Sequence, residues 1–183
     1  MRVIGGKLRG RRVKSPKSQS VRPTADRVKE ALFNILPHDL TGFKVLDLFA
    51  GTGNLSIEAL SRGAKESLLV DASRQSGKTI RDNLTALGFS EVSKVWTAPV
   101  FRSLRLLAQK GETFDMIFLD PPYERGWVGQ TVEIVAGKGL LRAGGVLVAE
   151  HSVREKVEQR YGPLVLRDQR RYGTTVLSFF GSE

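Results

Sequence analysis

The apolar residues of this chain change their spacing along its length. Between residues 24 and 36 they recur at intervals of three and four, which predicts an amphipathic helix that Pro37 ends. From about Thr41, short and nearly continuous apolar runs alternate with longer amphipathic segments. The runs predict strands over residues 44–49, 67–71, 91–96, 114–119 and 145–150. The segments around them predict helices over residues 54–62, 73–87, 100–109 and 127–136.

Nearly continuous apolar strands that alternate with helices are typical of a parallel sheet covered on both faces. Two further apolar runs, 163–168 and 174–180, are joined by the short stretch R-R-Y-G, which favours an antiparallel pair. We therefore expect an α/β fold with a mostly parallel seven-stranded sheet and an antiparallel C-terminal strand.

The first residues have a different character. In M-R-V-I-G-G-K-L-R-G-R-R-V-K, residues 1–14, short apolar pairs surround three glycines, which predicts a small β hairpin. A polar linker follows. We expect two units: a basic N-terminal hairpin with its linker over residues 1–21, and a Rossmann-like domain over residues 22–183.

Composition narrows the class of protein. The chain has 183 residues, is 40% hydrophobic and contains no cysteine, which excludes disulfides and thiolate metal sites. The two histidines, His38 and His151, lie far apart in the sequence and form no metal-ligand spacing. No apolar run approaches the roughly 18 residues that span a bilayer. These features predict a soluble, cytoplasmic protein without a metal or a membrane partner, with a monomer as the simplest state.

The positive charge is concentrated near the N-terminus. Residues 1–30 hold ten lysines and arginines against only Asp26 and Glu30, so this stretch carries +8 of the net charge of +10. Such a concentration predicts a polyanionic partner, most often a nucleic acid. A solvated basic arm that improves solubility is the alternative.

A glycine-rich turn follows the first predicted strand, in V-L-D-L-F-A-G-T-G at residues 45–53. Gly51 and Gly53 allow the backbone to turn tightly and to approach a ligand. The next strand ends at Asp71, where a carboxylate can accept hydrogen bonds from both hydroxyls of a ribose. The combination predicts a nucleoside cofactor across the carboxyl ends of the first two strands.

Three interpretations of a nucleoside site compete. A dinucleotide site needs G-x-G-x-x-G, but the third glycine position is Ser56, and Asp47 would repel a pyrophosphate. A P-loop over residues 72–79 lacks its first glycine, which is Ala72 here. Asp47 suits a cofactor with an amino group and a sulfonium, which favours S-adenosylmethionine. A tight turn that binds no ligand is the remaining alternative.

The fourth predicted strand ends in D-P-P-Y, residues 120–123. Two prolines can continue neither a sheet nor a helix, so Pro122 fixes a rigid turn in the crevice where open α/β sheets bind ligands. Asp120 and the carbonyl of Pro121 can both accept hydrogen bonds from an exocyclic amine and orient its lone pair. Tyr123 can stack on a flipped base. The pattern predicts methyl transfer to a nucleobase amine; the alternative is a rigid turn with a surface tyrosine.

These motifs together resemble the RsmD-type bacterial 16S rRNA guanine-N2 methyltransferases, from residue 1 to about residue 180. The stretches that carry the resemblance are M-R-V-I-G-G-K-L-R-G-R-R (1–12), R-P-T-A-D-R-V-K-E-A-L-F-N-I-L (22–36), V-L-D-L-F-A-G-T-G (45–53), E-A-L-S-R-G-A (58–64), D-P-P-Y (120–123) and R-R-Y-G-T-T (170–175). The glycine turn and D-P-P-Y are common among amino methyltransferases, whereas the first two stretches single out this family.

The resemblance implies a Rossmann-like S-adenosylmethionine-dependent methyltransferase fold. It implies methylation of the N2 amine of one guanine in 16S rRNA, on a partly assembled small ribosomal subunit. Catalytic contacts to the target amine would come from Asp120, Pro121, Pro122 and Tyr123. The donor would be bound by Arg22, Pro23, Thr24, Asp47, Phe49, Gly51, Gly53, Asp71 and Ala72. The phosphates of the RNA would be bound by Arg2, Lys7, Arg9, Arg11 and Arg12. Such contacts position the RNA without recognising its bases.

One stretch departs from the family pattern, and other functions stay open. Residues 97–100, T-A-P-V, offer no acid or amide to the adenine amino group, so backbone and apolar contacts would hold it. A DNA adenine-N6 methyltransferase can use D-P-P-Y but usually needs a sizeable target-recognition domain. A non-catalytic RNA-binding assembly factor would not need the three acids Asp47, Asp71 and Asp120. A methyltransferase for small molecules or protein amines would leave the basic N-terminus without a role.

Overall fold

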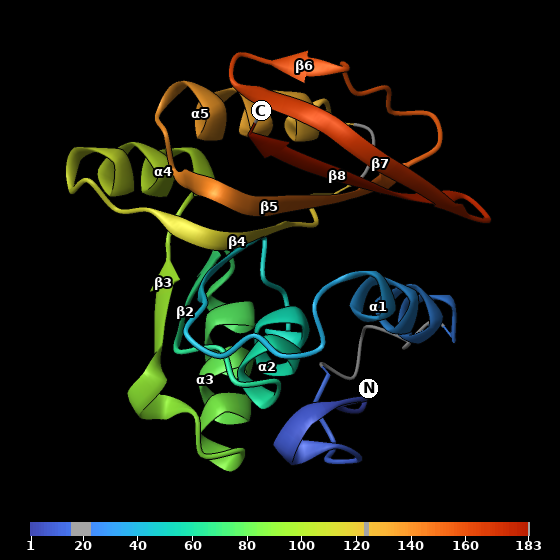
Figure 1. The fold of residues 1–183 in the computed structure, drawn as a ribbon. Coiled ribbons are helices and arrows are strands. Elements are labelled where there is room, and N and C mark those ends of the chain that lie inside the picture. Colours follow the sequence, from blue (N-terminus) through green and yellow to red (C-terminus); the bar gives the residue numbers. More distant parts are fainter. Residues whose placement is uncertain (16–22, 123–124, 183) are drawn as a thin grey trace.

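One open sheet of eight strands forms the centre of the computed structural model, which describes residues 1–15, 23–122 and 125–182, without the side chains of 23–26 (Figure 1). Neighbouring strands follow the order β3-β2-β1-β4-β5-β8-β7-β6. The strands are β1 (Lys44–Leu48), β2 (Glu66–Asp71), β3 (Ser93–Thr97), β4 (Phe114–Leu119), β5 (Leu141–Ser152), β6 (Arg160–Tyr161), β7 (Leu164–Tyr172) and β8 (Thr175–Ser182). The first five strands are parallel to one another, as their apolar runs predict.

The C-terminal end of the sheet differs from the prediction of seven strands with one antiparallel strand. β8 is antiparallel to β5, β7 is antiparallel to β8, and β6 is antiparallel to β7. β6 has only two residues, too few for an alternating pattern to be visible in the sequence. The sheet is therefore mixed, with five parallel strands followed by an antiparallel extension.

Helices cover both faces of the sheet within the described residues (Figure 1). They are η1 (Gly6–Leu8), α1 (Pro23–Ile35), α2 (Asn54–Ser61), α3 (Arg74–Ala86), η2 (Ser90–Val92), α4 (Val100–Gln109) and α5 (Trp127–Gly137). The apolar sides of α1, α2 and α3 share one core with the sheet, and those of α4 and α5 share the other. None of the helices in the described ranges is long and apolar enough to cross a membrane.

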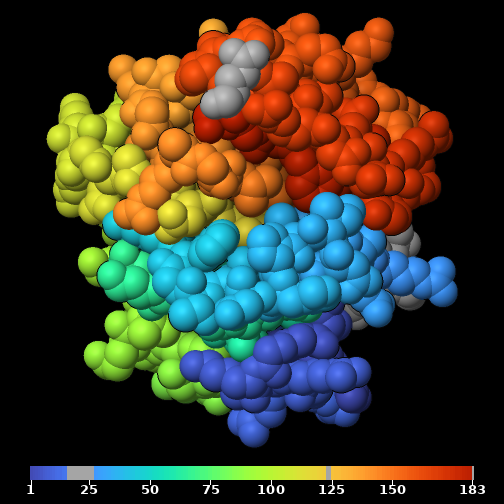
Figure 2. Space-filling view, viewed as in Figure 1, coloured from blue at the N-terminus to red at the C-terminus, as the bar shows by residue number. Residues whose placement is uncertain are grey.

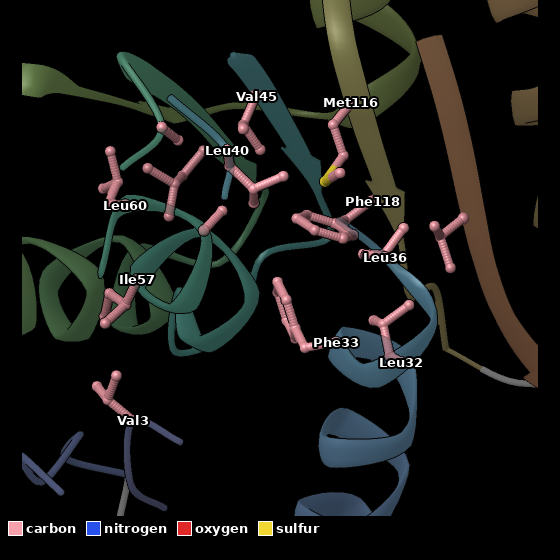
Figure 3. Close-up of a cluster of buried hydrophobic side chains, with 14 of the residues drawn as sticks. Val3, Leu32, Phe33, Leu36, Leu40, Val45, Ile57, Leu60, Met116 and Phe118 are labelled. Atoms are coloured by element: carbon pink, nitrogen blue, oxygen red, sulfur yellow. The ribbon is translucent and has the colours of Figure 1, made fainter. Parts of the chain in front are cut away.

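The apolar stripe predicted for α1 packs onto the middle of the sheet (Figure 3). Leu32 and Phe33 are almost fully buried, and the Phe33 ring lies 5.8 Å from the ring of Phe118 on β4. Ile35, which the spacing also places on this stripe, is 41% exposed. By burying about two large apolar side chains per turn against β1 and β4, α1 stabilises the strands that end beside the candidate site.

Residues 1–15, called the N-terminal segment below, form a small loop at one end of the molecule (Figure 2). Its two arms are antiparallel, with one isolated bridge between Arg2 and Arg12, and η1 forms its tip. The predicted β hairpin is therefore present as two arms with one bridged pair, joined by main-chain hydrogen bonds from Val3 to Arg11, from Gly10 to Val3 and from Val13 to Met1. Val3 and Val13 are buried and attach the two arms to the core. In Figure 2, α1 and the residues after it form a band between this segment and the C-terminal strands.

Candidate active site

The carboxyl ends of β2, β1, β4 and β5 lie side by side at one edge of the sheet. Leu48 at the end of β1 pairs with Val70 of β2 on one side and with Leu119 of β4 on the other. The main-chain N–H of Asp120 donates a hydrogen bond to the carbonyl of Leu48, at 3.4 Å. The glycine turn after β1 and the D-P-P-Y turn after β4 are thus neighbours on the same edge, as the predicted transfer of a methyl group from a donor at one turn to an amine at the other requires.

The glycine turn is held to the end of β2 by a carboxylate. The main-chain N–H of Gly51 donates to Asp71 Oδ2 at 2.9 Å, and the N–H of Ser73 donates to Asp71 Oδ1 at 2.8 Å. Gly51 and Gly53 have φ angles of 57° and 76°, which favour glycine. A Cβ on Gly53 would also lie 3.0 Å from Leu69 Cδ2. Each oxygen of the half-buried Asp71 keeps acceptor capacity for a further donor.

Asp47 lies beneath this turn and is 2% exposed. Its Oδ2 accepts hydrogen bonds from the main-chain N–H of Ser56 at 3.2 Å and from the Ser56 hydroxyl at 2.9 Å. Burial raises the pKa of Asp47 to about 7, although the two hydrogen bonds from Ser56 oppose this shift; the charge of Asp71 adds to it. A carboxyl with such a pKa ionises readily beside a cation at neutral pH.

Phe49 has an unusual backbone and an aromatic partner. Its φ angle is 61°, in the left-handed region that bulky residues rarely adopt. Its ring stacks on Trp127 at 5.5 Å with an interplanar angle of 16°, and Phe101 meets the same indole edge to face at 6.1 Å. The guanidinium of Arg125 lies 5.3 Å above the Trp127 ring. These contacts join the glycine turn to the start of α5.

No role was predicted from the sequence for Trp127, Phe101 or Arg125. The sequence signal for Trp127 is weak: it follows D-P-P-Y by four positions, directly after Gly126. Gly126 has a φ angle of 66° at the start of α5. Aromatic rings are more often core residues than site residues. Trp127 belongs to the site because its ring stacks on Phe49, which lies in the turn after β1.

Asp120 stands among carboxylates at the end of β4. It is exposed to solvent, and Pro121 beside it is buried. Desolvation by the surrounding protein, and then the charges of Glu150 and Asp47, raise the pKa of Asp120 well above its usual value. Because water reaches Asp120, its desolvation is incomplete. We therefore take the charges of Glu150 and Asp47 as the main reason that its pKa is raised.

The remaining predicted site residues are placed as follows. Ala72 is exposed directly after β2, and Pro122 is exposed after Pro121. Tyr123 and Arg22 lie outside the described residues, as do the side chains of Pro23 and Thr24. β3 ends at Thr97, whose Oγ1 accepts a hydrogen bond from Arg81 at 3.1 Å, and Ala98 and Pro99 follow the strand. No group of three or more histidine, aspartate or glutamate side chains in the described part of the chain is arranged to hold a metal ion.

The five basic residues predicted to contact RNA are all exposed on the N-terminal segment: Arg2, Lys7, Arg9, Arg11 and Arg12. The segment that carries them is fixed to α2 by Glu58, a fully buried carboxylate. Glu58 accepts hydrogen bonds from the main-chain N–H groups of Ile4 at 2.9 Å and Gly5 at 2.8 Å. Arg62 Nε donates to the same carboxylate at 3.1 Å, and Lys29 Nζ lies 3.7 Å from it.

Glu58 and Arg62 belong to E-A-L-S-R-G-A, a stretch that carried the resemblance without a role. Ser61 follows on the same helix, where its hydroxyl donates to the carbonyl of Gly5 at 2.7 Å. The sequence alone could not assign these contacts, because the partners are more than 50 residues apart.

The model of the family described as "Conserved hypothetical protein 95", Cons_hypoth95, matches residues 1–181. The chain belongs to the Cons_hypoth95 family. The resemblance to RsmD-type enzymes is confirmed at this level.

Two curated members illustrate the family. YlbH of Bacillus subtilis (strain 168), whose name proposes an rRNA methyltransferase, is 36% identical over 180 residues, 98% of this chain and 98% of YlbH. Ribosomal RNA small subunit methyltransferase D of Escherichia coli (strain K12) is 37% identical over 155 residues, 84% of this chain and 75% of that protein.

Solved structures share the fold. The structure of yhhF from Escherichia coli, whose name proposes a methyltransferase, has a TM-score of 0.84 at 32% identity and covers 100% of this chain and 98% of its own. A more distant structure, SMU.776, complexed with SAH, has a TM-score of 0.70 at 17% identity and covers 87% of this chain and 50% of its own. This Cons_hypoth95 member has the α/β fold of S-adenosylmethionine-dependent methyltransferases.

Proposed function

We propose that this protein transfers a methyl group from S-adenosylmethionine to the N2 amine of a guanine in 16S rRNA of the small ribosomal subunit. The observation that carries the proposal is the shared sheet edge of β1 and β4, which brings the glycine turn beside Asp120. The names of the relatives, ribosomal RNA methyltransferases, support the choice of substrate.

The residues on the β1–β2 side fit the methyl donor. Asp71 has both carboxylate oxygens fixed by N–H groups of Gly51 and Ser73, and each oxygen retains capacity for one ribose hydroxyl. Asp47 is a buried carboxyl whose pKa of about 7 makes its ionised form sensitive to a nearby cation. A sulfonium and an ammonium supply such positive charge, whereas a pyrophosphate would be repelled.

The residues on the β4 side fit the acceptor. S-adenosylmethionine, when bound, supplies a methyl group on a sulfonium, and the attacking amine must be aligned with it. Asp120 and the Pro121 carbonyl would accept hydrogen bonds from the amine and turn its lone pair towards the donor. The transfer would form a bond between the amine nitrogen and the methyl carbon as the sulfonium S–C bond breaks, with that electron pair left on the sulfur of the departing thioether. The raised pKa of Asp120 makes its carboxylate a suitable acceptor for the proton that the amine releases.

The N-terminal segment fits the RNA backbone. Its five exposed cations stand on a loop whose backbone is fixed by Glu58 and by two buried valines. A fixed basic loop loses little conformational entropy when it binds phosphates. Such contacts hold a folded RNA in register while the base is recognised elsewhere.

A methyl-transfer assay tests the proposal. Purified protein and methyl-tritiated S-adenosylmethionine are incubated with partly assembled small subunits, with free 16S rRNA or with duplex DNA, and modified bases are mapped by mass spectrometry. We expect N2-methylguanine at one 16S position. Transfer to DNA as N6-methyladenine would favour the DNA enzyme instead. A protein whose melting temperature does not change with S-adenosylmethionine would favour the non-catalytic assembly factor.

Asp71 provides the control for the donor site. Asp71→Ala should raise the apparent donor constant and leave RNA binding unchanged, because it removes both the ribose acceptor and the acceptor of the Gly51 and Ser73 N–H groups, which all belong to the donor side of the site. An unchanged donor constant would contradict the ribose role.

A further inference from the structure

Glu150 occupies the position next to Asp120 on the neighbouring strand. β4 and β5 are parallel, and their register ends with the pair of Leu119 and Ala149, so the following residues are Asp120 and Glu150. Side chains alternate along a strand, so residues two positions apart share a face. Phe118 and Val148, two positions before Asp120 and Glu150, both face the core beneath α1. The two carboxyls therefore lie on the same face, about one strand spacing apart.

Electrostatics agrees with this placement. The charge of Glu150 is one of the causes that raise the pKa of Asp120. Glu150 is half-buried, and it pairs with Leu177 of β8, a fully buried residue. The position is thus held by β8 on one side and directly follows the last β4 pair on the other, at the carboxyl edge where the proposed target base would be received.

We propose that Glu150 determines the choice of base by accepting a hydrogen bond from N1–H of the target guanine. This inference rests on the proposed function and deepens it. The Watson–Crick edge of guanine presents two adjacent donors, the N1–H and the N2 amine. Two adjacent carboxyls, Glu150 and Asp120, match that pair of donors, with Asp120 on the amine that is methylated.

The same pair of carboxyls disfavours adenine. An adenine that presents its N6 amine to Asp120 brings the lone pair of N1, an acceptor, towards the carboxylate of Glu150. Two acceptors without a proton between them repel, and a site built for a hydrogen bond strongly rejects an analogue that lacks the donor. Base choice would then follow from this second acid, since Asp120 and the prolines serve either amine equally well.

Base analogues test this inference without depending on the overall rate. The substrate is a small-subunit particle whose 16S rRNA carries guanine or 2-aminopurine at the methylated position mapped above. 2-Aminopurine keeps the N2 amine and has a bare N1 acceptor. For the wild-type protein, we expect kcat/KM to be on the order of 100-fold higher with guanine. A wild-type protein that methylates both bases equally would overturn the inference.

The variant Glu150→Gln supplies a second and independent arm. Its carboxamide can donate to the bare N1 of 2-aminopurine, so the guanine to 2-aminopurine ratio should fall at least tenfold relative to wild type. Intrinsic differences between the two amines cancel in this comparison. Glu133→Gln, an exposed glutamate on α5, is the matched control and should leave the ratio unchanged. A ratio that stays at the wild-type value in Glu150→Gln, whatever its rate, contradicts the inference.

The outcomes separate this inference from the proposed function. If the wild-type protein transfers no methyl group to the guanine particle, the proposed function fails. If it methylates guanine but either analogue arm gives the contradicting result, only the role of Glu150 fails. If Glu150→Gln does not fold, as judged by its thermal unfolding, the wild-type comparison of the two bases still decides.

Discussion

The side-chain amide of Asn83 donates a hydrogen bond to the carbonyl of Thr52, at 3.0 Å. Asn83 stands on α3 and is 2% exposed, and Thr52 lies between the two glycines of the turn after β1. The same side chain also accepts from the N–H of Lys14 at 2.9 Å and donates to the carbonyl of Lys14 at 3.0 Å. One buried amide thus connects the donor turn with the end of the N-terminal segment.

Asn83→Ala should therefore loosen both the donor turn and the end of the N-terminal segment. It leaves one main-chain group of buried Thr52 and two of exposed Lys14 without this partner, so the free energy of unfolding should fall by about 1–3 kcal/mol. The KM values for donor and RNA should both rise. Asn83→Asp keeps the acceptor for the Lys14 N–H and loses both donated bonds, so its effect on the donor constant should match that of alanine. Chemical unfolding and steady-state kinetics measure these effects; a change in the RNA constant alone would contradict the connection.

The parts of the site that follow from topology were predictable. Asp47, Asp71 and Asp120 each end a strand or lie near its end, and the rule that parallel strands share their carboxyl edge brings them together. The bounds of α4 were predicted to the residue, because its apolar spacing is strong and proline precedes it. By contrast, Glu58, Asn83 and Glu150 act through partners distant in sequence, and no local pattern distinguishes a buried polar residue from an exposed one.

Asp47 should make stability depend on pH. Its folded-state pKa is about 7, above the ordinary value of an aspartate. Between about pH 4 and pH 7 the folded protein holds a proton that the unfolded chain releases. The free energy of unfolding should therefore fall as pH rises through this window, by at most about 4 kcal/mol.

Asp47→Asn should remove this part of the slope. Urea unfolding at pH 5, 6, 7 and 8 gives the free energy for both proteins, and the difference between them isolates Asp47 from other titrating groups. We expect the variant to gain stability relative to wild type as the pH rises. Parallel curves over the whole range would show that Asp47 ionises in the folded protein as it does in the unfolded chain.

Glu58 should be essential for the order of the N-terminal segment. Glu58→Ala removes the acceptor of two main-chain N–H groups and the partner of buried Lys29 and Arg62. Loss of one member of a buried ion pair typically costs about 3–5 kcal/mol. Glu66→Ala, which removes a half-exposed partner of Lys44, is the control and should cost under about 1 kcal/mol.

Hydrogen exchange distinguishes local from global effects of Glu58→Ala. The amides of Ile4 and Gly5 should lose protection before those of β1 and β4. If these amides stay as protected as in wild type while the protein is folded, Glu58 does not fix the segment.

Asp120→Ala should reduce turnover by roughly 100-fold or more, because contacts made to the reacting group in the transition state have about this size. Donor binding should be unchanged, since Asp120 belongs to the β4 side of the site. Single-turnover rates and donor titration by calorimetry give the two quantities separately. Full activity in this variant would contradict the proposed mechanism.

The exposed cations of the N-terminal segment should set the salt dependence of RNA binding. Neutralising Arg9, Arg11 and Arg12 removes up to three phosphate contacts, and each contact contributes about 0.7–0.9 to the slope of log K against log salt. The slope should therefore fall by about 2, with weaker binding at low salt. The control variant neutralises Arg102, Arg105 and Lys138, exposed cations of α4 and of the end of α5 on the opposite face of the sheet. Since both variants lose the same net charge, an equal fall in slope would mean that RNA responds to overall charge rather than to this loop.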